Sequence, residues 1–168
     1  RSDRDGNTVP TFTGSVSLSL VKQGVGGTYA ATGDATISAA SPTLVDGVFT
    51  WSNYTIKGKV GSYKIVATYT DTVPDPAVDY TATSDAITVT NAAFYQLAVT
   101  GQPDGDAVNR TAEGAIEVTA QDRDGNPVTG FAGTVGLSLK KLVSGSYVTT
   151  TDATISAATP TLVDGVLR

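Results

Sequence analysis

The 168-residue chain contains no cysteine, no methionine and no histidine. Without cysteine there is no disulfide bond and no thiolate nucleophile, and without histidine the commonest general base and metal ligand is missing. Zinc fingers, iron–sulfur centres and catalytic pairs built on Cys or His are therefore excluded. We expect a protein that is not an enzyme and has no cofactor, apart from the calcium ion considered below.

Charge and long apolar runs are also scarce. Charged residues make up 16% of the chain, the formal net charge is −5, and the 11 Lys and Arg residues are scattered. Nucleic-acid binding needs a basic patch, and a membrane span needs roughly 20 consecutive apolar residues. We therefore expect no nucleic-acid partner and no membrane insertion. Apolar residues still amount to 40%, which is enough to build a core.

What the chain does contain is an internal repeat. The matching segments are 3–20 with 122–139, and 34–48 with 152–166. The first pair is 119 residues apart and the second 118. The second copy is therefore one residue shorter than the first in the part that corresponds to the stretch between Lys22 and Tyr29. This stretch is rich in glycine and predicts a hairpin loop, where repeats tolerate changes of length.

The seam between the copies is expected at Asn91-Ala92-Ala93, where one strand pattern ends and another begins. Residues 1–93 then form a repeat that lacks its N-terminal strands, and residues 94–168 a repeat that lacks its C-terminal strands. The expected partners are neighbouring copies or repeats of the same protein, joined in a longer tandem array or by strand exchange between chains. A self-contained sandwich in permuted order and an arbitrary piece of an array are the remaining alternatives.

The hydrophobic pattern is that of β-strands throughout. Apolar residues alternate in five segments, 16–20, 63–69, 87–89, 95–99 and 116–120. Clusters of Gly, Pro, Asp and Asn, such as Asp46-Gly47, close these runs. No window of about 11 residues keeps a helical period. The prediction is an all-β chain of two-sheet sandwiches, with about seven strands in each repeat.

Two groups of motifs resemble bacterial Ig-like repeats of the invasin and adhesin type. One runs from Gly101-Gln102-Pro103 through segment 115–128 to segment 133–139, and the other joins segment 46–51 to segment 61–68. The resemblance implies Ig-like β-sandwiches in tandem, with a period of about 119 residues and both terminal repeats incomplete.

This resemblance also implies a function and a location. Such repeats serve as stalks, filaments and surface-layer building blocks, so we expect a non-enzymatic, extracellular or cell-surface structural module. The alternative is an adhesin module that binds a carbohydrate or a receptor, with cell-surface glycans as partners.

Two Asp-rich turns are the candidates for a metal site. Their oxygen-bearing side chains alternate along the chain: Asp3, Asp5 and Asn7 in one copy, and Asp122, Asp124 and Asn126 in the other. This spacing matches the first half of a calcium loop, although the twelfth position from Asp122, which requires Glu, is Gly133. Asp-Gly and Gly-Asn are equally favoured in tight turns, so a calcium site and a structural turn both stay open. Segment 104–106 is a further candidate of the same kind.

The remaining candidates concern sugars. A glycosidase needs two carboxylates that face each other across a cleft. The only Glu residues are Glu113 and Glu117, and the alternating pattern places Glu117 on the solvent face of a predicted strand, so we do not expect a glycosidase. The aromatic residues that could stack on a sugar are Trp51, Tyr54, Tyr63 and Tyr69. A sandwich core is the more usual place for Trp51, Tyr63 and Tyr69.

Overall fold

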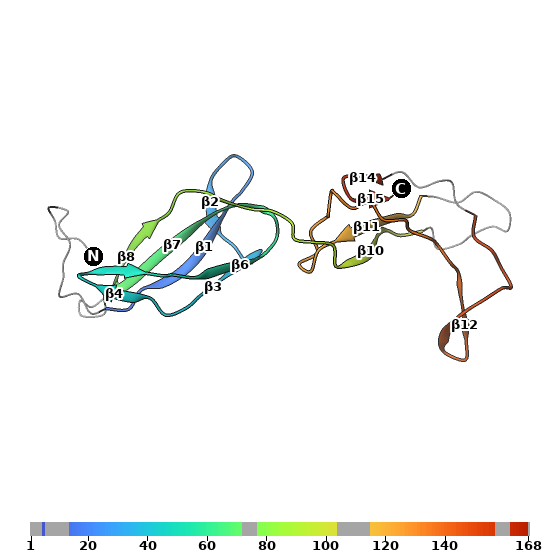
Figure 1. The fold of residues 1–168 in the computed structure, drawn as a ribbon, viewed down its shortest axis with the longest axis horizontal. Helices are drawn as coiled ribbons and strands as arrows, with labels where there is room; N and C mark the ends of the chain where they lie inside the picture. The colour runs from blue at the N-terminus through green and yellow to red at the C-terminus, as the bar shows by residue number, and fades with distance from the viewer. Residues whose placement is uncertain (1–4, 6–13, 72–76, 104–114, 157–161, 168) are drawn as a thin grey trace. The chain divides into compact units, whose positions relative to one another are not determined.

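The computed structural model describes residues 5, 14–71, 77–103, 115–156 and 162–167, and these residues form antiparallel sheets (Figure 1). Within these ranges there is no helix, and so none that is long and apolar enough to cross a membrane. The chain divides into two compact units, Arg1–Asn91 and Ala92–Arg168. The division falls within the seam that the repeat predicts.

The first unit contains one large antiparallel sheet. Its strands are, in spatial order, β2 (Tyr29–Ala31), β1 (Ser17–Gln23), β7 (Gly61–Asp71) and β8 (Val78–Thr83), and β9 (Ile87–Val89) also pairs with β7. Alternation of apolar residues with Ser, Thr and Lys suits β1 and β7 to a sheet with one buried face. The sequence patterns at 16–20, 63–69 and 87–89 therefore predicted real strands.

Two short strand pairs accompany this sheet: β3 (Ala35–Ala39) with β6 (Tyr54–Gly58), and β4 (Thr43–Val45) with β5 (Val48–Thr50). The buried core joins Leu20 of β1, Ala35 of β3 and Tyr63 of β7. Partly buried side chains pack around it: Ile37, Ile56, Ile65 and Val89. The core thus lies between the large sheet and the β3–β6 pair, which is a sandwich-like arrangement.

The second unit contains a four-stranded antiparallel sheet in the order β10 (Gln96–Gly101), β11 (Glu117–Gln121), β15 (Val166–Leu167) and β14 (Leu162–Val163). A separate hairpin is formed by β12 (Lys140–Val143) and β13 (Ser146–Thr149). The patterns at 95–99 and 116–120 therefore also predicted strands.

Strand β11 is more buried than its sequence predicts. The alternating pattern predicts that Glu117 and Thr119 face solvent. In the structure Thr119 is only 3% exposed, between the buried residues Val118 and Ala120, and Glu117 is half-buried. The physical reason is position: β11 is bonded on one side to β10 and on the other to β15, so it is a central strand. The Thr119 hydroxyl pairs with that of Thr100 at 2.8 Å, which satisfies a buried polar group.

Two hairpins turn on the dipeptide Asp-Gly. In Asp46-Gly47 the φ angles are 48° and 76°, and in Asp164-Gly165 they are 49° and 78°. Positive φ at both central residues is the type I′ geometry, whose twist matches that of the flanking strands. The turn predicted at Asp46-Gly47 is confirmed.

Candidate functional site

The Asp122 turn is the most elaborate polar cluster among the described residues. Asp122 and Asn126 are 1% and 2% exposed. The backbone N–H groups of Asp124 and Asn126 each donate to Asp122 Oδ1 at 2.9 Å. The Asn126 side-chain amide donates to Oδ2 at 2.9 Å, and the backbone N–H of Ala92 donates to Oδ2 at 3.0 Å. One carboxylate therefore ties the start of the second unit to a turn 30 residues later.

The hydrogen bonds determine the charge state of this carboxylate. Burial alone would raise the pKa of Asp122, because it disfavours the charged form. Donation from the Asn126 side chain and from the backbone of Ala92, Asn126 and Asp124 outweighs burial and lowers the pKa from 3.8 to about 2. Asp122 is therefore ionised at neutral pH.

The calcium hypothesis concerns the same residues and stays a prediction. Asp122 uses both oxygens as acceptors for N–H groups, so a cation would have to share or displace these bonds. Asp124 is exposed, and Asp5 lies in an exposed turn. Asp3, Asn7 and segment 104–106 lie outside the described residues. Within the described ranges, no three Asp, Glu, His or Cys side chains gather as a metal site would require.

A second feature is a hairpin that occurs in both units. In the first unit, β1 pairs with β2 in the register Val21↔Ala31, Lys22↔Ala30 and Gln23↔Tyr29. In the second unit, β12 pairs with β13 in the register Lys140↔Thr149, Lys141↔Val148 and Leu142↔Tyr147. Each residue of the second set is 119 or 118 positions after its counterpart in the first. The one-residue difference in length between the two copies therefore falls in the hairpin loop, as the sequence predicts.

The same ion pair accompanies both hairpins. Lys22 Nζ lies 2.6 Å from Asp34 Oδ2, and Lys141 Nζ lies 2.6 Å from Asp152 Oδ2. The bond to Asp34 raises the pKa of Lys22. Sequence reasoning did not assign these pairs, although the recurrence of both residue types at the repeat spacing was a usable signal. Surface ion pairs contribute at most about 1 kcal/mol to the free energy of unfolding. These two pairs are therefore of interest because they show that the two hairpins are equivalent.

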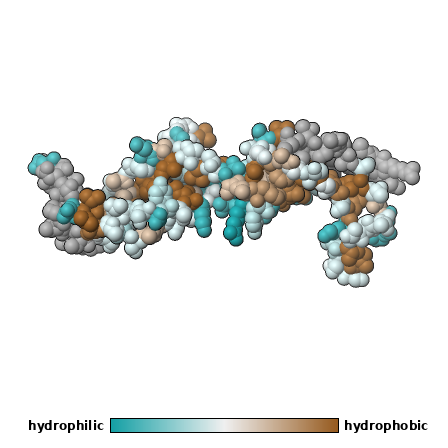
Figure 2. Space-filling model, in the orientation of Figure 1, coloured by the Kyte–Doolittle hydropathy of each residue, from teal (hydrophilic) through white to brown (hydrophobic). Residues whose placement is uncertain are grey.

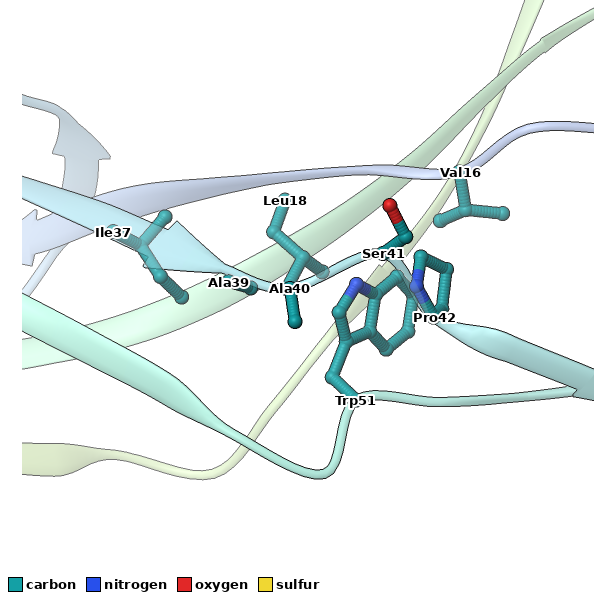
Figure 3. Close-up of a pocket in the computed structure, with 8 residues that line it drawn as sticks. All are labelled: Val16, Leu18, Ile37, Ala39, Ala40, Ser41, Pro42 and Trp51. Atoms are coloured by element: carbon teal, nitrogen blue, oxygen red, sulfur yellow. The ribbon is translucent and has the colours of Figure 1, made fainter.

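A pocket of about 310 Å³ opens beside Trp51 in the first unit (Figure 3). Its lining residues are Val16, Leu18, Ile37, Ala39, Ala40, Ser41, Pro42 and Trp51. The Trp51 side chain points from the end of β5 towards the segment before β4 (Figure 3). The indole also stacks with Phe49 at a centroid distance of 6.0 Å. Trp51 is half-buried.

The other three aromatic candidates differ in their burial. Tyr63 is 0% exposed, and its hydroxyl donates to the Lys59 carbonyl at 2.7 Å, so its predicted place in the core is confirmed. Tyr69 is half-buried and stacks with Tyr80 across β7 and β8 at 6.2 Å. Tyr54 is exposed on β6.

An exposed apolar surface on the β12–β13 hairpin was missed by the sequence analysis. Every residue of both strands is exposed, and Figure 2 shows apolar surface at this hairpin. The large side chains are Leu142, Val143, Tyr147 and Val148. The sequence of the hairpin alone does not reveal this exposure, because similar apolar residues of the first-unit strand β1, such as Leu20, are buried.

Comparisons of the chain with protein-family models, curated proteins and solved structures found no match. The resemblance to bacterial Ig-like repeats therefore stays a prediction from the motifs. The function has to be inferred from the residues and the geometry of this chain.

Proposed function

We propose that the chain is a non-enzymatic structural module made of tandem Ig-like β-sandwich repeats, and that it builds a stalk, filament or surface layer outside a bacterial cell. The observation that carries the proposal is the hairpin found in both units. Its strand register and its Lys–Asp ion pair recur at the spacing of the sequence repeat, 119 and 118 residues.

Recurrence of this kind favours a structural role for a physical reason. Residues repeated in both units make the contacts that form each unit: a hairpin register, an ion pair and the Asp-Gly turns at Asp46 and Asp164. In repeat proteins such contacts stabilise each copy and its neighbour, and function follows from the length of the array. The partners in this proposal are other repeats or copies of the same protein.

Light scattering coupled to size-exclusion chromatography, followed by electron microscopy of the same fractions, tests this proposal. We expect regular fibres, lattices or extended multi-repeat particles at high protein concentration. Particles that stay single and unordered under all conditions, and that bind a defined glycan, contradict the structural role.

The pocket beside Trp51 favours one second candidate, a carbohydrate-binding or receptor-binding adhesin module. Aromatic faces stack on sugar rings, and Trp51 is half-buried and lines a pocket. A glycan array probed with the wild-type chain tests this candidate, with Trp51→Ala as the disrupting variant and Tyr54→Ala as the matched exposed control. Binding that is lost only in Trp51→Ala supports the adhesin function, and absence of binding by the wild type refutes it.

A further inference from the structure

The first residues of the second unit, 92–95, are held by the turn that follows β11. The backbone N–H of Ala92 donates to Asp122 Oδ2 at 3.0 Å, and the backbone N–H of Tyr95 donates to the Gln121 carbonyl at 2.8 Å. The pairing of β10 with β11 begins at the next residue of the chain. Both bonds therefore lie ahead of the first residue pair of these two strands.

Two ring contacts hold the same short segment. The guanidinium carbon of Arg123 lies 5.6 Å from the centroid of the Tyr95 ring, which is close enough for a cation–π interaction. The Phe94 ring packs against Phe131 in a tilted arrangement, with 4.7 Å between centroids. Two hydrogen bonds and two ring contacts thus join the segment to residues 121–131. We call these four contacts the entry latch.

Asp122 is the central group of the entry latch. Its carboxylate is 1% exposed and is ionised at neutral pH. Oδ1 accepts the backbone N–H groups of Asp124 and Asn126, so the carboxylate is fixed within its own turn while Oδ2 holds Ala92. Hydrogen bonds to an ionised acceptor are roughly twice as strong as those between neutral groups. A force on Ala92 is therefore transmitted to the turn through this carboxylate.

The place of Ala92 in the chain decides which contacts a pulling force reaches first. Strand β9 of the first unit ends at Val89, and the second unit begins at Ala92. In a stalk or filament of tandem units, tension passes along the chain and enters the second unit at this residue. The hydrogen bonds of an antiparallel pair are perpendicular to its strands, so a force that pulls one end apart breaks them one pair at a time. Contacts ahead of the first pair protect the others.

We propose that the entry latch is a tension-bearing element, in which the Asp122 carboxylate takes up the force that reaches Ala92 and prevents the separation of β10 from β11. This inference rests on the proposed structural role, because a stalk or filament module is under tension. It differs from a contribution to stability alone, since it predicts that the contacts ahead of the first strand pair control the rate at which a pulling force opens the unit.

Single-molecule force spectroscopy on the full chain tests the proposal. The sequence contains no cysteine, so Thr90→Cys and Asp124→Cys supply two specific attachment points, both at exposed positions. A force between these points passes through the entry latch, and opening lets the chain extend through residues 92–122. The 30 residues that separate Ala92 from Asp122 predict a length increase of about 100 Å, at roughly 3.5 Å for each extended residue.

Three variants separate the latch from the general stability of the unit. At constant force, Asp122→Ala should raise the opening rate at least about tenfold, because the ionised acceptor ahead of the first strand pair is lost. Arg123→Ala removes an exposed side chain that the fold does not need, and should raise the rate about threefold. Val118→Ala is the matched control: Val118 is buried in β11 but pairs with Val99, behind the first pair, so its contacts are intact when the latch opens and the rate should change less than about twofold.

Three outcomes overturn the proposal. They are an opening rate that neither Asp122→Ala nor Arg123→Ala raises, an equal increase of the rate in Val118→Ala, and a first length increase that differs from about 100 Å, which would place the opening outside residues 92–122. The structural role has a separate readout, because ordered assembly is measured by microscopy without force. Fibres or lattices formed by a chain whose opening rate does not depend on the latch therefore reject the latch alone.

Discussion

Replacement of Asp122 by alanine should destabilise the second unit and leave the first unit unchanged. The carboxylate is buried and accepts hydrogen bonds from the backbone of Ala92, Asp124 and Asn126, and from the Asn126 side chain. Its pKa of about 2, against 3.8 for the free group, corresponds to up to about 2 kcal/mol of stabilisation of the charged form. Loss of the acceptor breaks these same hydrogen bonds and leaves their buried donors unpaired, so the expected loss of stability is about 2–3 kcal/mol.

The chain offers a way to assign this loss to one unit. Trp51, the single tryptophan, belongs to the first unit, so its fluorescence reports unfolding of that unit. Amide exchange of Val118 and Ala120 reports the second unit. In urea, Asp122→Ala should leave the fluorescence transition in place and strongly increase exchange in β11. Asp124→Ala, at an exposed position of the same turn, should change the stability of the second unit by at most about 1 kcal/mol.

The pH dependence of the second unit provides an independent check. The pKa of Asp122 is lower in the folded state than in the unfolded state. Its carboxylate therefore stabilises the second unit above the unfolded pKa of 3.8, and this stabilisation is lost as the pH falls towards about 2. Asp122→Asn should lose this dependence. An Asp122→Ala protein with unchanged β11 exchange, or with an equally shifted tryptophan transition, would refute the assignment of this carboxylate to the stability of the second unit.

Three further predictions concern a turn, a matched pair of leucines and metal binding. Gly165→Ala should destabilise the second unit by more than about 1 kcal/mol, because Gly165 has a positive φ and a Cβ there would lie 2.5 Å from the Val128 carbonyl oxygen; urea unfolding of the second unit measures this, and a smaller loss would contradict the close approach. Leu20→Ala should destabilise the first unit by about 3 kcal/mol, whereas Leu139→Ala should change the second by less than about 1 kcal/mol, and equal effects would contradict the difference in burial. The calcium hypothesis predicts a higher melting temperature in excess calcium than in chelator, although a cation at Asp122 would have to displace N–H donors from its carboxylate; an equal melting temperature would contradict the hypothesis.

Local patterns predicted the strands and one turn well. The alternating segments coincide with β1, β7, β9, β10 and β11, because alternation directly reflects a sheet with one buried face. Asp46-Gly47 was predictable for a similar reason, since few dipeptides adopt positive φ twice in succession.

Features that depend on distant pairing could not be read from the sequence. The burial of Thr119 follows from the central position of β11, which requires knowledge of both neighbouring strands. The bond from Ala92 to Asp122 joins a backbone N–H to a side chain 30 residues away, and no residue type marks such a donor. The sequence therefore left the Asp122 turn open between a calcium loop and a structural turn.

The most direct test of the structural role is small-angle X-ray scattering on polypeptides that carry two, three and four tandem copies of residues 3–121, which is one full period. If each period folds as one repeat of an array, the maximum dimension should increase by a constant amount with every added copy. A maximum dimension that stays constant, or that grows irregularly as the copies collapse on one another, would contradict the proposal that this chain is a structural repeat module.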